Sequence, residues 1–287
     1  MWNPFNRNTI SNSSASKRSL QLITQKGMPF AYVEAYKALR TNLNFLSGSG
    51  DVHAFVVTST VPEEAKSNVS VNLALALTES GKKVVLVDCD LRKPVLHRYL
   101  KAGHNLKGVS NVLSRQVALS DALVEPKGIP NLTFLPAGTT PPNPSELLSQ
   151  PQMQEMVATL RGSYDFVILD APPISMVTDA AVIGRIVDGA LFVVRSKYAS
   201  TDAVKTALEK LQDAGVKVLG AVLTRYDAKK SLKRSDYGYG YYYYNSNYSY
   251  GTPPDSISES AAEKSCLTSK KRHNGKEKHS VHTEDET

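Results

Sequence analysis

The stretch from His53 to Pro94 constrains the fold of this chain more than any other part of it, and reads HAFVVTSTVPEEAKSNVSVNLALALTESGKKVVLVDCDLRKP. Ala54–Val57 is a short apolar run rich in β-branched residues, the composition of a buried strand. After a polar turn, Lys66-Ser67 opens the segment Val69–Leu77, which is apolar on nearly all sides and predicts a buried helix. This order indicates a phosphate site, because the first turn of a helix presents unpaired N–H groups and a positive dipole end.

In such a site Lys66 would reach the β and γ phosphate oxygens, and the Ser67 hydroxyl would bind Mg²⁺. The P-loop pattern G-x-x-x-x-G-K-[ST] has glycines where this chain has Thr60 and Ala65. An alanine forced into a left-handed conformation costs about 1 kcal/mol, which weakens a site without abolishing it. Taken alone, Ala-Lys-Ser is equally compatible with an ordinary turn between a strand and a helix.

Two aspartates favour the nucleotide interpretation. The apolar run Val84–Val87 predicts a strand that ends in Asp88-Cys89-Asp90. Because residues two apart on a strand share a face, both acids are expected at its carboxyl end, where α/β sheets bind ligands, while Cys89 points away and packs. Two adjacent carboxylates are costly unless a metal or a substrate proton occupies them. Arg92, just beyond, could contact phosphate or simply balance the two acids.

Composition bounds the rest of the chain. Of 287 residues 41% are hydrophobic, which suits one α/β domain of about 200 residues with flanking segments. The net charge of +7 is not gathered into a stripe, and the mildly basic residues 1–33 suit a membrane surface, an acidic partner or mere solubility. The two cysteines lie far apart, so no disulfide framework is expected. No apolar run is long enough to cross a bilayer and no signal peptide is visible, so a cytosolic protein is expected.

Strands and helices alternate along the chain. Helices are expected at 31–46, 109–123, 143–160, 178–187 and 201–214, and further strands at 132–135, 165–170, 190–195 and 217–223. Asn143 and Pro144 start one helix as its N-cap and first residue. This alternation predicts an α/β fold with a mostly parallel sheet and helices on both faces. The acid at the end of strand 165–170, Asp170, is typical of a second Mg²⁺-orienting carboxylate, although a turn-initiating Asp before proline is the alternative.

Two other features stay open at this level. In the helix at 31–46, Glu34, Lys37 and Arg40 recur every three residues beside the apolar stripe, and the residues alone favour a solvated charged face. The segment Tyr237–Tyr250, YGYGYYYYNSNYSY, holds eight of the chain's 14 tyrosines. It is either a low-complexity aromatic segment for stacking or self-association, or a set of exposed hydroxyls offered as phosphoacceptors.

Together these motifs resemble the bacterial tyrosine kinases of capsule and exopolysaccharide loci, in particular the type whose kinase is a separate cytoplasmic subunit. The resemblance spans about residues 31–250. It rests on EAYKALRTNL at 34–43, TSTVPEEAKS at 58–67, VVLVDCDLRKP at 84–94, NPSELL at 143–148, YDFVILDAPP at 164–173 and the tyrosine cluster. Chromosome-partitioning and division-site ATPases share the nucleotide motifs but lack the tyrosine tail.

The resemblance implies a P-loop fold of the deviant, partitioning-ATPase-like type that uses ATP and Mg²⁺. It makes Lys66 and Asp88 catalytic, with Asp88 as the base for the acceptor tyrosine. The other implied roles are nucleotide contacts from Glu63, Glu64, Ala65, Lys66, Ser67, Asn68 and Arg92; Mg²⁺ ligation by Ser67, Asp90 and Asp170; an oligomer interface at Glu34, Lys37 and Arg40; and phosphoacceptors at Tyr237, Tyr239, Tyr241, Tyr242, Tyr243, Tyr244, Tyr248 and Tyr250. The chain departs from the family pattern at Glu63, Ala65, Asn68, Lys37 and Thr224, which bears on nucleotide affinity and turnover more than on fold.

The sequence therefore predicts a protein-tyrosine autokinase that phosphorylates the tail of a neighbouring copy and regulates polysaccharide synthesis and export. A partitioning-type ATPase and a weakly active nucleotide-binding regulator are the alternatives. The expected divisions are a disordered arm at 1–30, a P-loop kinase domain at 31–226, a linker with the tyrosine cluster at 227–250 and a disordered charged tail at 251–287. The resemblance further implies a transmembrane activator of the polysaccharide co-polymerase type that recruits the chain to the inner face of the membrane, a homo-oligomer and a cognate tyrosine phosphatase, and no nucleic acid.

Overall fold

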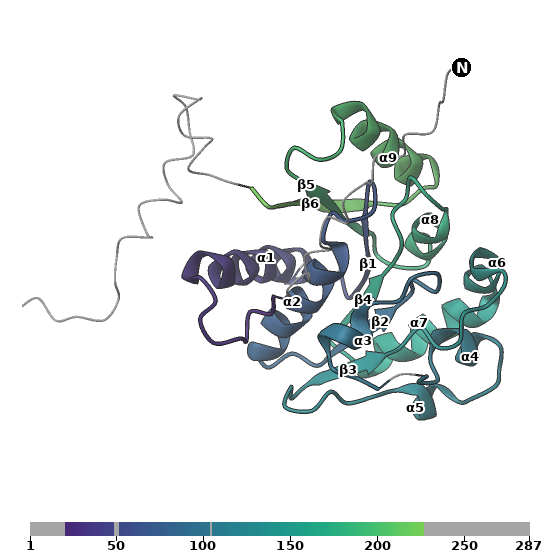
Figure 1. Ribbon diagram of the computed structural model, residues 1–287. Helices are drawn as coiled ribbons and strands as arrows, with labels where there is room; N and C mark the ends of the chain where they lie inside the picture. Colours follow the sequence, from purple (N-terminus) through teal and green to yellow (C-terminus); the bar gives the residue numbers. More distant parts are fainter. Residues whose placement is uncertain (1–20, 49–51, 104, 227–287) are drawn as a thin grey trace, which may run out of the picture. The chain divides into compact units, whose positions relative to one another are not determined.

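The computed structural model describes residues 21–48, 52–103 and 105–226. Within these residues six parallel strands form one sheet in the order β3-β2-β4-β1-β5-β6, as Figure 1 shows. The strands are β1 (Ala54–Ser59), β2 (Val84–Asp88), β3 (Leu132–Leu135), β4 (Phe166–Asp170), β5 (Ala190–Arg195) and β6 (Val218–Thr224). The predicted parallel α/β sheet is confirmed.

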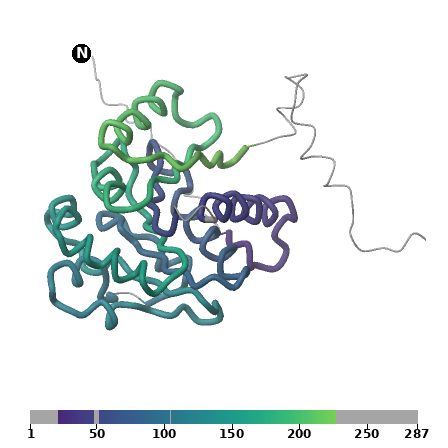
Figure 2. Tube along the Cα trace, turned by 180° about the vertical axis from the view of Figure 1, so that it is seen from behind, coloured from purple at the N-terminus to yellow at the C-terminus, as the bar shows by residue number. Residues whose placement is uncertain are grey.

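Helices cover both faces of the sheet (Figures 1 and 2). One face carries α1 (Phe30–Gly48), α2 (Lys66–Glu79) and α3 (Leu96–Tyr99), and the other carries α4 (Val109–Leu113), α5 (Leu119–Ala122), α6 (Pro144–Leu148), α7 (Pro151–Ser163), α8 (Asp179–Gly184) and α9 (Thr201–Asp213). Because neighbouring strand residues point to opposite faces, Val84 and Leu86 belong to the core under α2, whereas Val85 and Val87 belong to the core under α7.

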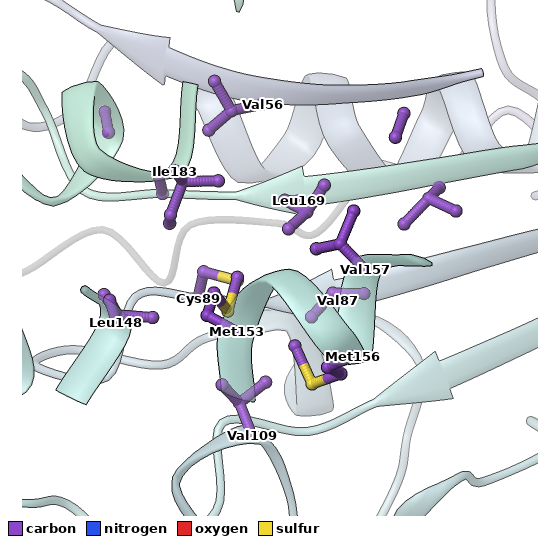
Figure 3. Packing of buried hydrophobic residues seen from close by; sticks show 14 of the residues in the cluster. Val56, Val87, Cys89, Val109, Leu148, Met153, Met156, Val157, Leu169 and Ile183 are labelled. Carbon is purple, nitrogen blue, oxygen red and sulfur yellow. The ribbon is translucent and has the colours of Figure 1, made fainter. Parts of the chain in front are cut away.

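The core between the sheet and α7 is closely filled. Figure 3 shows Val157 of α7 next to the sheet residues Leu169 and Val87. Cys89 lies fully buried in the same cluster, beside Met153 (Figure 3). The predicted packing role of Cys89 is therefore confirmed, since its side chain lies on the face of the sheet opposite α2.

Two predicted helices are each divided in two. The helix expected at 109–123 stops after α4 because Arg115 adopts a left-handed φ of 56°, which an α-helix cannot accommodate. The helix expected at 143–160 is divided into α6 and α7 at Pro151. Proline lacks an N–H and disfavours a helical conformation in the residue before it, and Gln150 is extended at φ −71° and ψ 152°.

Two further differences concern segments outside the predicted elements. The short helix α3, which follows β2, was not predicted. Residues 21–29, assigned from the sequence to the N-terminal arm, include a turn, and Ile23 packs into the core while its N–H donates to Asn72 Oδ1 at 2.8 Å. Residues 1–20 and 227–287, with the remaining predicted arm, the tyrosine cluster and the charged tail, lie outside the described residues. Among the helices that are described, none has the length and apolar character to cross a bilayer.

Candidate active site

The carboxyl ends of β1, β4 and β2 bring the predicted site residues together. Since all strands are parallel, the loop 60–65 after β1 lies at the same edge as the terminal acids of the other two strands. Strand β4 lies between β1 and β2, and its Asp170 is in register with Asp88 of β2 and with Val57 of β1. The next residue after the loop, Lys66, begins α2.

The Lys66 ammonium group joins three of the predicted residues. Its Nζ lies 3.1 Å from Asp90 Oδ2, 3.2 Å from Asp170 Oδ2 and 3.2 Å from Ser67 Oγ. The side chain of Lys66 is only 12% exposed, and burial alone would lower its pKa. The carboxylates of Asp170 and Asp90 outweigh burial and hold the pKa of Lys66 above its usual range.

Asp170 is fully buried and both of its carboxylate oxygens accept hydrogen bonds. The Ser67 hydroxyl donates to Oδ2 at 2.6 Å and the Ser70 hydroxyl donates to Oδ1 at 2.9 Å. Burial raises the pKa of Asp170, opposed by the Lys66 ammonium and by these two hydroxyls. The sequence interpretation missed Ser70, although its place three residues after Ser67 puts both hydroxyls on one face of α2.

Asp88 lies beside this network without an ion pair in it. It is buried at 1% exposure and accepts hydrogen bonds from the N–H groups of Leu96 at 3.2 Å and Asp90 at 3.3 Å. Burial, reinforced by the charge of Asp170, raises the pKa of Asp88 to about 8, against the opposing effect of Lys66. A carboxyl group with this pKa exchanges a proton near neutral pH, which is what a general base requires.

The raised pKa of Asp88 predicts a pH-dependent stability. Between its unfolded value of 3.8 and its folded value of about 8, the folded chain holds more protons than the unfolded chain, so stability falls as pH rises. Asp88→Asn removes this dependence. The free energy of unfolding of the variant relative to wild type should rise between pH 5 and 7.5, by up to about 1.4 kcal/mol per pH unit. Urea unfolding at several pH values checks this, and a pH-independent difference would contradict the assignment.

The loop that precedes Lys66 keeps the conformation of a glycine-rich loop without its glycines. Glu63 and Ala65 both adopt a left-handed φ of 72°. Glu64 stabilises the loop through its buried carboxylate, which accepts hydrogen bonds from the N–H groups of Val61 at 2.9 Å and Arg195 at 3.1 Å. The side chain of Glu64 is thus engaged inside the protein, and the nucleotide contact predicted for this residue stays a prediction that only its backbone is free to fulfil.

The left-handed φ of Ala65 predicts the effect of restoring a glycine. Ala65→Gly should leave the free energy of unfolding unchanged or raise it by up to about 1 kcal/mol, since glycine adopts this conformation without a Cβ penalty. Ala38→Gly, at an exposed position of α1, is the matched control and should lower it by about 1 kcal/mol. Chemical denaturation measures both, and equal losses would show that Ala65 is unstrained.

Two predicted nucleotide-binding side chains point to other partners. Asn68 Oδ1 accepts hydrogen bonds from the hydroxyls of Tyr32 at 3.0 Å and Tyr36 at 3.2 Å, which ties the start of α2 to α1. The Arg92 guanidinium binds Asp179, with Nε 3.1 Å from Oδ2, and donates from Nη2 to Ser145 Oγ at 2.8 Å. Arg92 thus balances a third acid rather than Asp88 or Asp90, and nothing in the sequence pattern singled out Asp179.

The three charged residues of α1 do not share one environment. Lys37 Nζ lies 2.7 Å from Glu34 Oε1, and both side chains are about two-fifths exposed, at 42% and 41%. Arg40 instead turns toward α2, where its Nη1 donates to the carbonyl of Ala76 at 2.8 Å. Glu34 and Lys37 therefore remain on the surface, while Arg40 links α1 to the carboxyl-terminal half of α2.

The oxygen atoms at the site suit Mg²⁺. Ser67, Asp90 and Asp170 offer the hard oxygen ligands that Mg²⁺ prefers, and two carboxylates with a hydroxyl leave positions for water and phosphate. Within the described residues no three His, Cys, Asp or Glu side chains form a cluster able to hold a metal ion by themselves.

Comparison with known proteins agrees with this geometry. Residues 64–218 match the family described as AAA domain. The chain is 37% identical over 205 residues to the tyrosine-protein kinase YwqD of Bacillus subtilis, covering 71% of this chain and 84% of that protein. It is 36% identical over 198 residues to the putative tyrosine-protein kinase CapB of Staphylococcus aureus, covering 69% and 86%. Against the tyrosine-protein kinase wzc of Salmonella typhimurium the identity is 34% over 72% of this chain, but only 28% of that protein is covered.

Solved structures show the same relationship. The kinase domain of the Escherichia coli tyrosine kinase ETK superposes with a TM-score of 0.64 at 33% identity, covering 73% of this chain and 80% of that one. The cobyrinic acid a,c-diamide synthase of Mycobacterium smegmatis, solved with an ATP analogue and magnesium, gives a TM-score of 0.54 at 24% identity over 64% of this chain and 83% of that one. The second similarity concerns the fold alone.

Proposed function

The chain belongs to the family of bacterial tyrosine-protein kinases, and from that premise we propose that it transfers the γ-phosphoryl group of Mg-ATP to the tyrosines at 237–250 of a neighbouring copy. The observation that carries the proposal is the cluster at the ends of β1, β4 and β2. There Lys66 and Ser67 meet Asp90 and Asp170, with the protonatable Asp88 next to them.

Each residue has a task in this proposal. Lys66 would exchange its two carboxylate partners for phosphate oxygens, and the acids that it leaves, with Ser67, would hold a magnesium ion. Mg²⁺, when bound, neutralises phosphate charge and aligns the reacting groups. The acceptor phenol oxygen forms a bond to the γ-phosphorus as the bond from that phosphorus to the β,γ-bridging oxygen breaks. The phenol proton passes to Asp88, and ADP leaves with the electron pair.

The position of β6 supports the tail as acceptor. The strand runs parallel to the others, so its end lies at the active-site edge, where the Thr224 hydroxyl donates to the carbonyl of Glu64 in the loop at 2.9 Å. Tyr226 is the last described residue, and the ten residues before Tyr237 reach at most about 33–36 Å. This reach permits transfer within one chain and suits transfer to an adjacent copy, which places donor and acceptor face to face.

The proposal extends to partners. The part of wzc that matches this chain is 28% of that protein. We propose, as the resemblance implies, that a transmembrane activator of the co-polymerase type recruits the kinase to the membrane. We further propose that residues 31–226 are the kinase domain, that Glu34, Lys37 and Arg40 contribute to a homo-oligomer interface, that a cognate phosphatase reverses the modification and that polysaccharide synthesis and export are regulated.

A mixture of two defective chains tests both the activity and the transfer between copies. One chain carries Asp88→Asn, and the other has its eight tail tyrosines replaced by Phe. With Mg-ATP, intact mass should show phosphate on the Asp88→Asn chain, whereas mixing it with a tail-Phe chain that also carries Lys66→Ala should show none. Glu34→Ala with Arg40→Ala in both chains should suppress the signal. Wild type that gains no phosphate would favour the regulator, and concentration-independent modification would place transfer within one chain.

A further inference from the structure

A pocket lies beside the acids at the carboxyl edge of the sheet. It has a volume of about 170 Å³ and is lined by Arg92 and the segment Pro142–Glu146. Pockets that bury a drug-sized ligand have about 300–1,000 Å³, so this one suits a single side chain rather than a nucleotide. No role proposed above uses it.

The guanidinium group of Arg92 is fixed along one edge. Nε lies 3.1 Å from Asp179 Oδ2, and Nη2 lies 3.4 Å from Asp179 Oδ1 and 2.8 Å from Ser145 Oγ. Ser145 also hydrogen-bonds Asp179. Asp179 is fully buried, while the side chain of Arg92 is 38% exposed. Nη1 has no hydrogen-bond partner among the residues that the structure describes, so one edge of the guanidinium group stays available to the pocket.

The arrangement has a plain structural role, since it connects the end of β2 to α6 and α8. This ion pair is by itself weak support for stability, however, because withdrawing the Asp179 carboxylate from water is costly while the Arg92 cation stays partly exposed. A guanidinium group that is fixed on one edge and open on the other is pre-organised to hold a ligand, because little side-chain entropy remains to be lost on binding.

The order of the strands gives the order of the candidate sites along the carboxyl edge of the sheet. Along the carboxyl edge the sequence is β1 with the phosphate loop, β4 with Asp170, β2 with Asp88 and Asp90, and then β3. Arg92 follows β2, and the segment Pro142–Glu146 follows β3. Arg92 comes two residues after Asp90, so the pocket adjoins the acids at this edge of the sheet. Phosphoryl transfer needs the acceptor oxygen in line with the γ-phosphorus and the leaving oxygen, and a pocket that adjoins Asp88 is a place from which a phenol can approach that base.

From this order we propose that the pocket formed by Arg92 and Pro142–Glu146 receives the acceptor tyrosine, with Asp179 and Ser145 as positioning residues for Arg92; this rests on the kinase function proposed above. The exposed Pro142 offers an apolar surface to the phenol ring, and Arg92 offers a cation to its face. The chain already contains one such pair, since Arg195 lies 4.3 Å from the centre of the Tyr198 ring.

Peptide kinetics separate this site from the nucleotide site. The enzyme is the full chain with its eight tail tyrosines replaced by Phe, and the substrate is a synthetic peptide of residues 236–251. Arg92→Ala should raise the KM for the peptide about tenfold and change the Kd for Mg-ATP less than twofold. Lys93→Ala, which removes a neighbouring exposed cation outside the pocket lining, should change neither. Pro142→Ala is the substitute test if Arg92→Ala fails to fold. It changes an exposed residue of the pocket, leaves the ion pair intact and should also raise the KM for the peptide.

A direct measurement of peptide binding tests the pocket without relying on phosphotransfer. Anisotropy of the labelled peptide on the Asp88→Asn chain should show the same tenfold weakening by Arg92→Ala, even if the chain transfers no phosphate. A weakened Kd for Mg-ATP with unchanged peptide binding would make Arg92 a nucleotide ligand and overturn the inference. A peptide that binds only when its tyrosines are already phosphorylated would overturn it as well, because the pocket would then recognise phosphate.

Discussion

Replacing Asp88 with asparagine is expected to lower the rate of tyrosine phosphorylation at least about a hundredfold, while the Kd for Mg-ATP changes less than threefold. Asparagine preserves the shape of the side chain but cannot take the proton of the acceptor phenol. The two carboxylate oxygens of Asp88 accept backbone hydrogen bonds from Asp90 and Leu96, so the amide oxygen of asparagine can keep one of these bonds and the other is lost. Nucleotide binding by titration calorimetry and phosphotransfer by intact mass measure the two properties separately.

Two controls define the outcome for Asp88. Asp213→Asn, at the exposed end of α9, removes one carboxylate far along the chain from the site and should change neither property. Asp90→Asn removes a carboxylate that binds Lys66 at 3.1 Å, and should weaken Mg²⁺-dependent nucleotide binding as well as transfer. If Asp88→Asn and Asp90→Asn weaken both properties equally, the division between base and metal ligand is wrong.

Local sequence patterns were sufficient for the sheet. The strands β1, β2 and β4 are runs of residues buried on both faces, so the alternation of strand and helix leaves few other arrangements. The same patterns failed where one residue outweighed its neighbours. Pro151 lies inside an otherwise helical pattern and ends α6, and the left-handed Arg115 ends the segment after α4 without any glycine to signal it.

The candidate site was predictable where its residues are adjacent to strand ends. Lys66, Asp88, Asp90 and Asp170 are fixed by the βαβ pattern because parallel strands bring their carboxyl ends to one edge. Asp179 was not predictable, since its importance comes from Arg92, 87 residues away in the chain. A contact between a loop after one strand and the first residue of a helix after another has no period in the sequence, so only the folded structure shows it.

Replacing Lys66 with alanine should abolish phosphotransfer and remove the stabilisation that Mg-ATP gives to wild type. It should also destabilise the protein without nucleotide. The ammonium group lies between two carboxylates at 3.1 and 3.2 Å, in a site where Asp170 is fully buried. Removing one partner of a buried ion pair costs about 3–5 kcal/mol. Nucleotide affinity follows from thermal shifts with millimolar Mg-ATP, and stability follows from urea unfolding.

The pH dependence of the stability loss and a control lysine variant make the prediction for Lys66→Ala specific. The Lys66 ammonium opposes the burial that raises the pKa of Asp170. Without Lys66 that pKa should rise further, so the variant should lose most stability at pH 8 and least at pH 5, where a proton replaces the missing cation. Lys82→Ala breaks an exposed lysine–aspartate pair, with Lys82 Nζ 4.0 Å from Asp165 Oδ1, and should cost less than about 1 kcal/mol. Added Mg²⁺ should restore part of the stability of Lys66→Ala, because the cation takes the place of the ammonium group between the two acids. Equal losses in the two lysine variants, or a loss at Lys66 that neither pH nor Mg²⁺ changes, would mean that the carboxylates do not form the charged centre on which the proposed mechanism depends.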